Sequence, residues 1–485
     1  MNIAYASIQE LHEAYRNKEL TVKQVVLEFL SRIAKIDSCE GGLKSVIEVN
    51  PDVLFIAESL DRKLQDSDNL PPLFGIPVLV KDNINTGDRL HTSAGSVALG
   101  DNYALQDAHI VECLRMAGAV ILGKANMTEF ANYMSRDGMP SGYSSRGGQV
   151  VNPYNHEKDP SGSSSGSAVA VAAGLCTISI GTETSGSIIS PASNNGIVGI
   201  KPTLGLVSRS GIIPISSTFD TAGPMARTVT DAAILLNVLA EAESKAAPPF
   251  PGGNESGIWG RAPLDIDYTK YLGGKSLDGI RIGLNRAKEL PEDAQEEDIA
   301  IFNNLCNLLT QAGAVLVDNI EMTPHYDTRR TIMQHEFKAC INHYLATAAG
   351  STEMSTLKDI IEFNQANAEL ALKYGQSLLL DSQNKSSGRF TEPAYLEALL
   401  TRDKAITEMD SIFDSNNIDI LLGQAFVYIA PFTGFPSMTI PIGQRQDNNM
   451  PIRAFFTARR FDEATMIKVA YAVENILGLC LRPAI

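Results

Sequence analysis

The stretch DPSGSSSGSAVAVAAGLCTISIGTETSGSIIS, residues 159–190, decides the fold of this 485-residue chain. It holds two clusters of serine and glycine, separated by a run of small and β-branched residues at 168–181. Serine and glycine at this density are typical of flexible linkers, but a linker does not carry a long apolar run between its halves. We therefore predict two tight loops joined by a buried helix and strand. Small residues in such loops allow close backbone approach and leave amide groups free to point at a ligand.

The overall composition is that of a globular protein, with 44% apolar and 20% charged residues. A net charge of −16 argues against nucleic acid as a partner, because phosphate binding requires a basic face. The six cysteines are scattered and the seven histidines show no HExxH pattern, so we expect no metal site and no cofactor. The chain has no signal-peptide pattern at its start and no apolar run of the roughly 18 residues that cross a bilayer. These features predict a cytoplasmic protein without a membrane partner.

Outside the opening stretch, short apolar runs alternate with helical patterns. We predict strands at 73–80, 119–122, 176–181, 196–200, 280–283, 314–317, 418–422 and 437–442, and helices at 107–117, 228–241, 299–312 and 462–477. Residues 1–70 and 325–410 are expected to be mainly helical, and the proline- and glycine-rich segment 246–265 to be a surface excursion. This alternation is typical of α/β folds. We predict one large α/β domain, 1–485, with a mixed, mostly parallel central sheet flanked by helices.

Two positions in this framework suggest nucleophilic chemistry. Lys81 directly follows the predicted strand at 73–80, and Ser187 ends the glycine-rich turn that follows the strand at 176–181. Serine is a weak nucleophile that needs a base. A lysine can be that base if burial lowers its pKa, and backbone N–H groups of the turn could stabilise an oxyanion. On the residues alone, the alternative that these serines only cap and fill turns stays open.

A second alternative is an α/β-hydrolase-like esterase. GSSSG at 162–166 contains the G-x-S-x-G pattern, with Ser164 as the nucleophile. That motif requires a buried strand directly before it, whereas residues 151–160 are polar and contain two prolines. It also requires a histidine base, and nothing distinguishes His325, His335 or His343 in that role.

Several motifs in order resemble the amidase signature family. They are GIPVLVKDN at 75–83, GKANMTEFA at 123–131, SGSSSGSAVAVAAG at 161–174, GTETSGSIISPASNNGIVGIKPT at 181–203 and SRSGIIPISSTFDTAGPMARTVTDAA at 208–233. Two further segments resemble the family more weakly: FTGFPSMTIPIG at 432–443 and FDEATMIKVAYAVE at 461–474. The resemblance divides the chain into a signature core at about 70–240, a helical, specificity-determining region at about 240–410 and C-terminal strands and helix at about 415–485.

The resemblance implies an amidohydrolase with a Ser–Ser–Lys triad. By position, Lys81 matches the family's base, Ser163 its bridging serine and Ser187 the serine that is acylated. In the family the bridging serine follows a cis peptide bond, which is expected here between Gly162 and Ser163. Ser163 would relay a proton between Ser187 and Lys81, and water would hydrolyse the acyl-enzyme.

The family's oxyanion hole corresponds to the backbone N–H groups of Thr184, Ser185, Gly186 and Ser187. Ser185 stands where glycine is usual, so the donors survive only if its backbone is not of a glycine-only kind. Ile189 stands where many members have arginine, which weakens a resemblance to the A-type component of the tRNA-dependent glutamine amidotransferase.

The segments GSSSGS, GTET and SGIIPIS look more like the peptide-amidase branch, whose members remove the C-terminal amide of peptides. The expected substrate is therefore a peptide amide or a simple carboxamide. A glutamine amidotransferase component, and a binding protein built on the same scaffold, remain alternatives, and the oligomeric state is not readable from the sequence.

Overall fold

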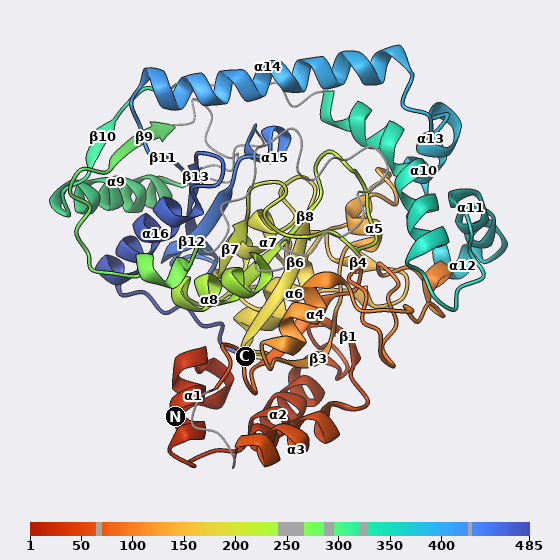
Figure 1. The fold of residues 1–485 in the computed structure, drawn as a ribbon, viewed down its shortest axis with the longest axis horizontal. Coiled ribbons are helices and arrows are strands. Elements are labelled where there is room, and N and C mark those ends of the chain that lie inside the picture. Colours follow the sequence, from red (N-terminus) through yellow and green to blue (C-terminus); the bar gives the residue numbers. More distant parts are fainter. Residues whose placement is uncertain (65–69, 241–265, 286–294, 321–327, 425–428) are drawn as a thin grey trace.

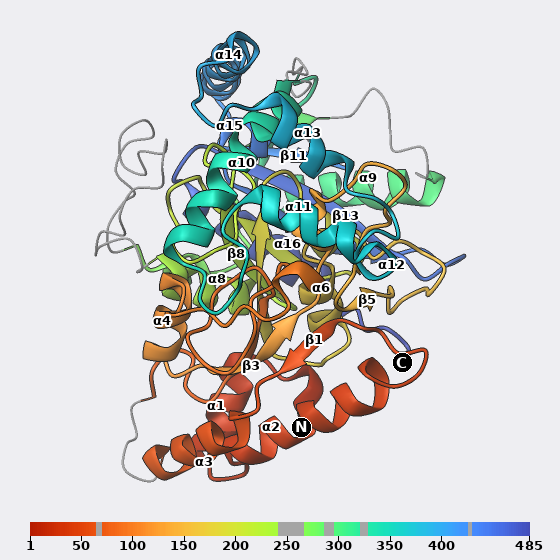
Figure 2. The ribbon, with the colours of Figure 1, turned by 90° about the vertical axis from the view of Figure 1, so that its right-hand side faces the viewer.

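The computed structural model describes residues 1–64, 70–240, 266–285, 295–320, 328–424 and 429–485. The predicted excursion at 246–265 lies outside these residues. A twisted sheet runs through the middle of the molecule and helices cover it (Figure 1). The N-terminal helices lie at one end and the long helix α14 at the other, in both views (Figures 1 and 2).

The central sheet has eleven strands in the order β1-β3-β2-β6-β8-β7-β12-β13-β11-β9-β10. Their bounds are β1 Val46–Val49, β2 Pro77–Lys81, β3 Val120–Ala125, β6 Ile178–Glu183, β7 Val198–Lys201, β8 Thr221–Ala226, β9 Arg281–Asn285, β10 Val315–Val317, β11 Ile420–Gly423, β12 Ser437–Gln444 and β13 Pro451–Ala458. A small hairpin, β4 Tyr143–Ser144 and β5 Gly148–Gln149, stands apart from it.

The mixed α/β sheet is confirmed, but it is less parallel than the alternation predicted. Within the described residues, β3, β2 and β6 are parallel neighbours, as are β11, β9 and β10. The six pairings between and beside these groups are antiparallel. The parallel strand β2 is buried along its whole length, as strands covered by helices on both faces are.

The helices agree well with the predicted pattern. Their bounds are α1 Ile8–Arg16, α2 Val22–Arg32, α3 Val53–Leu64, α4 His109–Met116, α5 Glu129–Asn132, α6 Ser165–Ala172, α7 Ile189–Asn194, α8 Val229–Ala240, α9 Glu296–Gln311, α10 Arg329–Thr347, α11 Leu357–Ala366, α12 Ala368–Ala371, α13 Ser377–Lys385, α14 Pro393–Ser415, α15 Ile429–Thr433 and α16 Glu463–Leu477. Ser7 and Thr21 form capping boxes at the starts of α1 and α2, in the region expected to be mainly helical.

Three strands of the central sheet were not predicted. β1 lies in a region expected to be helical; it is a four-residue edge strand, too short for a clear pattern. β8, sequence TAGPMA, contains glycine and proline, which normally argue against a central strand. Gly223 is needed there because a Cβ would lie 2.1 Å from the carbonyl oxygen of Ile200. β13, which pairs with β11 and β12, is the third.

The prediction for the opening stretch is confirmed. Helix α6 is completely buried and runs from the first serine loop into β6, which ends at the second. Small residues are required in α6: a Cβ on Gly166 would lie 2.3 Å from the carbonyl oxygen of Ser45. The close packing of α6 therefore holds the two serine loops together at one end of the parallel strands.

Candidate active site

Lys81 is the last residue of β2 and is completely buried. Its Nζ lies 2.8 Å from Ser163 Oγ, 2.9 Å from Thr182 Oγ1 and 3.1 Å from the carbonyl oxygen of Thr182. Burial lowers the pKa of Lys81 to about 7, against the opposing effect of the Glu183 and Asp220 charges. This lysine can therefore exist as a neutral amine near neutral pH.

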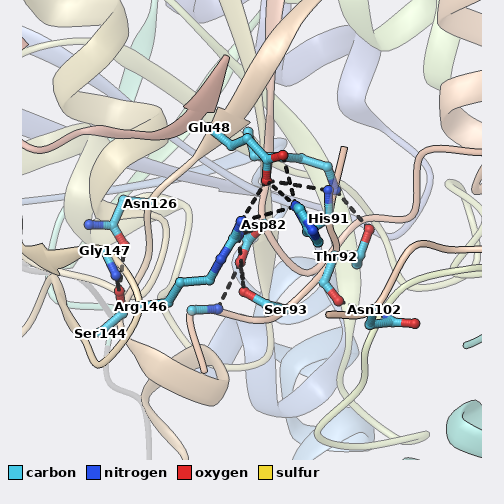
Figure 3. Close-up of polar contacts among 12 residues, drawn as sticks. Glu48, Asp82, His91, Thr92, Ser93, Asn102, Asn126, Ser144, Arg146 and Gly147 are labelled. Carbon is cyan, nitrogen blue, oxygen red and sulfur yellow. Dashed lines mark hydrogen bonds and ion pairs between the residues drawn. The ribbon is translucent and has the colours of Figure 1, made fainter. Parts of the chain in front are cut away.

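A network of charged side chains fixes the segment that follows β2 (Figure 3). Asp82 accepts a hydrogen bond from Ser93 Oγ and lies 3.6 Å from Arg146 Nη1. Arg146 Nη2 donates to Glu48 Oε2 at 2.7 Å, and His91 Nδ1 lies 2.8 Å from Glu48 Oε1. Because these groups come from β1, the loop after β2 and the hairpin loop, the network ties three segments together beside the strand end.

Ser163 lies on the first serine loop, and the peptide bond between Gly162 and Ser163 is cis, as the resemblance implied. Ser163 is completely buried, and its carbonyl oxygen accepts from the N–H of Thr128 at 3.0 Å. Gly162 cannot carry a side chain here, because a Cβ would lie 2.3 Å from Thr128 Oγ1. The residues of GKANMTEFA thus support the loop that presents Ser163 to Lys81.

Ser187 lies on the second serine loop, directly before α7, and is 7% exposed. Its carbonyl oxygen accepts from the N–H of Ser164 at 3.1 Å, which places it next to the loop of Ser163. Glu183 Oε2 accepts from the N–H groups of Ile188 at 2.7 Å and Ile189 at 3.0 Å. This carboxylate therefore fixes the turn in which Ser187 sits.

The turn that precedes Ser187 has the backbone of a potential oxyanion hole. Gly186 has φ +90°, a conformation that favours glycine, whereas Ser185 is not among the residues with positive φ. The serine at 185 is thus tolerated without a glycine-only backbone. The N–H of Gly186 is also among the backbone donors to Glu183, so this expected oxyanion donor already has a partner. Thr184, Ser185 and Ser187 supply the other candidate N–H groups.

A pocket opens beside these groups. It is lined by Asn83, Ala131, Thr182, Glu183, Thr184, Arg209, Ile212, Ile213, Pro214, Ile215, Ser216, Asp220 and Thr221. The segment 212–215 gives this lining an apolar wall, and most of the other lining residues are polar. Asp220 joins the turn that precedes Ser187 to the apolar segment 212–215. Its carboxylate accepts hydrogen bonds from Thr184 Oγ1 at 2.6 Å and from the N–H of Ile215 at 2.7 Å.

Sequence reasoning missed three contributors to this site. Thr182 supplies two of the Lys81 contacts, Asp220 joins the turn to the pocket wall, and Arg329 of α10 donates to Ser185 Oγ. Thr182 lies inside the GTET segment and could have been inferred from the motif. Asp220 and Arg329 carry no local pattern and become visible only through the tertiary structure.

The geometry does not favour the esterase alternative. Ser164 Oγ is buried and donates to the carbonyl oxygen of Thr182 at 3.1 Å while accepting from its N–H at 3.2 Å. The residues before it, 150–162, are loops and turns rather than the buried strand that the motif requires. His335 lies in α10, with Nδ1 2.8 Å from the carbonyl oxygen of Thr331. His325 lies outside the described residues.

In the part of the chain that the structure describes, no group of three or more His, Cys, Asp or Glu side chains could hold a metal ion. None of the helices in these same ranges is long and apolar enough to span a membrane.

Comparison with known proteins identifies the family. The family model described as Amidase matches residues 24–425. A protein named "Probable amidase" from Arabidopsis thaliana is 35% identical over 98% of this chain and 90% of its own length. The crystal structure of peptide amidase from Stenotrophomonas maltophilia superposes with a TM-score of 0.87, at 38% identity over 99% of this chain and 98% of that one. A component of the glutamyl-tRNA(Gln) amidotransferase from Carboxydothermus hydrogenoformans is 30% identical over 98% of both chains. This chain belongs to the amidase signature family and is a hydrolase that acts on amide bonds.

Proposed function

We propose that this amidase cleaves carboxamides through an acyl-enzyme on Ser187, with Lys81 as the base and Ser163 as the proton relay. The observation that carries the proposal is the hydrogen bond of 2.8 Å between the buried Lys81 Nζ and Ser163 Oγ, beside the loop of Ser187. A neutral amine has two N–H donors and one lone pair. The two acceptors of Thr182 take the donors, which leaves the lone pair for the Ser163 hydroxyl.

In the acylation step, Ser187 Oγ attacks the carbonyl carbon of the amide and its proton moves to Ser163 Oγ. The proton of Ser163 moves at the same time to Lys81 Nζ, which becomes an ammonium. When the C–N bond breaks, Lys81 returns the proton through Ser163 to the leaving nitrogen, and ammonia or an amine departs. Water then attacks the ester by the same relay, which releases the acid and restores Ser187.

The negative charge that develops on the carbonyl oxygen would be stabilised by the N–H groups of Thr184, Ser185 and Ser187. Donors that are already fixed in place stabilise a transition state without reorganisation. Two carboxylates provide this fixation: the buried Glu183 holds the start of α7, and the half-buried Asp220 holds the Thr184 side chain.

The substrate class we favour is the C-terminal amide of a peptide. The likeness to peptide amidase over 99% of the chain supports it, as does the apolar wall at 212–215, which would contact the last side chain of the peptide. Ile189 is uncharged and fully buried, and this position therefore offers no positive charge to a substrate.

The function is tested by the release of ammonia from a panel of substrates: an N-blocked dipeptide amide, a short aliphatic amide, and free glutamine. We expect kcat/KM for the dipeptide amide to exceed that for glutamine at least about tenfold, because only the former fills an apolar pocket. A preference for glutamine, particularly one that requires a second protein, would instead indicate an amidotransferase.

The pH profile tests the base. Lys81 must be neutral to accept a proton, and its pKa is lowered to about 7. Activity should therefore be lost as the pH falls through about 7 and stay high in mild alkali. Glu129 is also buried, and its pKa is raised to about 7, so it could produce the same limb. The variant Glu129→Gln should keep the limb; loss of the limb in this variant would assign it to Glu129 and contradict the role of Lys81.

A further inference from the structure

A charged side chain of helix α10 contacts the turn that contains the proposed oxyanion hole. Arg329 is the first residue of α10, and its Nη1 donates a hydrogen bond to Ser185 Oγ. Ser185 stands where glycine is usual in the family, so the acceptor of this bond is a feature of this chain. A hydrogen bond from a guanidinium is stronger than one between neutral groups, and more so where both side chains are only partly exposed.

The same helix is anchored to the pocket wall by a different residue. Glu336 lies two turns after Arg329, and is completely buried. Its carboxylate accepts from the N–H of Thr218 at 3.1 Å, from Tyr395 OH at 2.8 Å and from the hydroxyls of Ser216 and Thr218. α10 is therefore held in place independently of Arg329.

Apolar contacts strengthen this anchoring. Ile332, Phe337 and Ile341 of α10 are all fully buried, and the ring of Phe337 packs 4.8 Å from that of Tyr133. Removal of the Arg329 guanidinium should thus leave the helix docked, and the Ser185→Gly background shows how much of any effect passes through the Ser185 contact.

We propose that Arg329 is a positioning residue that holds the oxyanion turn through the hydroxyl of Ser185. The turn between β6 and α7 is fixed at its end by Glu183 and at its start by Asp220, through the Thr184 hydroxyl. Arg329 fixes the residue between them. The N–H of Ser185 is one of the donors that the reaction requires, so its placement affects the transition state more than substrate binding. This inference rests on the proposed function of Ser187 and its turn.

The test is a double-mutant cycle with Arg329→Met, Ser185→Gly and the double variant, in which kcat and KM are measured for a dipeptide amide. We expect Arg329→Met to lower kcat about tenfold to a hundredfold, with KM changed less than about threefold. In the Ser185→Gly background the same substitution should change kcat less than about threefold, because the acceptor is already absent. Arg329→Lys, which keeps the charge but not the planar fork, should recover part of the kcat.

Equal effects of Arg329→Met in both backgrounds, or no effect in either, would overturn the proposal. The proposal would also be overturned if Arg329→Met lowered the melting temperature so far that the unfolded fraction at the assay temperature accounted for the lower kcat. The role of Arg329 would then be structural. Covalent labelling of Ser187 by a fluorophosphonate distinguishes failure of the proposed function from failure of the role of Arg329. A wild-type protein that turns over amides but is not labelled at Ser187 contradicts the proposed function. A labelled wild-type protein with an unaffected Arg329→Met variant contradicts only the role of Arg329.

Discussion

Ser187→Ala is expected to lower kcat for amide hydrolysis by about 10⁴-fold or more, because no acyl-enzyme can form without the hydroxyl. The fold should be retained, since the backbone contacts of this turn are made by its N–H and carbonyl groups rather than by the Ser187 side chain. The measurement is ammonia release under saturating substrate, together with the melting temperature of each protein.

Ser190→Ala is the matched control for this variant. Ser190 lies three residues further along, on α7, and is half-buried, whereas Ser187 is buried. Its backbone N–H bonds to the carbonyl oxygen of Gly186, and alanine keeps this contact. We expect this variant to keep kcat within about threefold of the wild type. If Ser187→Ala retained more than about one per cent of the activity, the nucleophile would be a different residue.

Lys81→Met is expected to lower kcat by about 10³-fold, because it removes the proton acceptor while keeping most of the side-chain volume. The loss should persist at all pH values, unlike the acid-side loss in the wild type, since the variant has no amine to deprotonate. The loss is measured as kcat between about pH 6 and 10, and each kcat is corrected for the fraction of the protein that is folded.

Lys124→Met shows whether the loss of any buried lysine would have the same effect. Lys124 lies near the end of the neighbouring strand β3, is completely buried, and has a pKa lowered to about 8 by that burial. Its Nζ donates to Thr92 Oγ1 at 2.9 Å, away from the serine loops. We expect a lower melting temperature but a kcat within about tenfold of the wild type. Similar kcat losses in both variants would indicate that burial, rather than chemistry, explains the effect of Lys81.

Much of this architecture follows from local patterns. The two serine loops and the buried run between them predict α6 and β6, because only close packing explains small residues at that density. The apolar run before Lys81 predicts that this lysine lies at the end of a buried strand, which β2 confirms. The contact between Lys81 and Ser163 is different: it joins residues 82 positions apart, and only the family motif suggested it.

What escaped prediction depends on distant contacts. β8 is a central strand despite Gly223 and Pro224, because its backbone lies against β7 too closely for a side chain. Asp220 and Glu336 look like ordinary surface charges in the sequence, yet Asp220 is half-buried, Glu336 is completely buried, and each accepts several hydrogen bonds from the segment 215–218. The role of Glu336 arises because α10, far along the chain, packs against the segment 216–218, and no pattern at either site records that contact.

The central claim, that Ser187 is a nucleophile activated by Lys81, is tested most directly by a fluorophosphonate probe followed by peptide mapping of the modified residue. We expect a label on Ser187 in the wild-type protein, lost in Lys81→Met and kept in Lys124→Met. A label on Ser164, or a label on Ser187 that forms equally fast without Lys81, would contradict it.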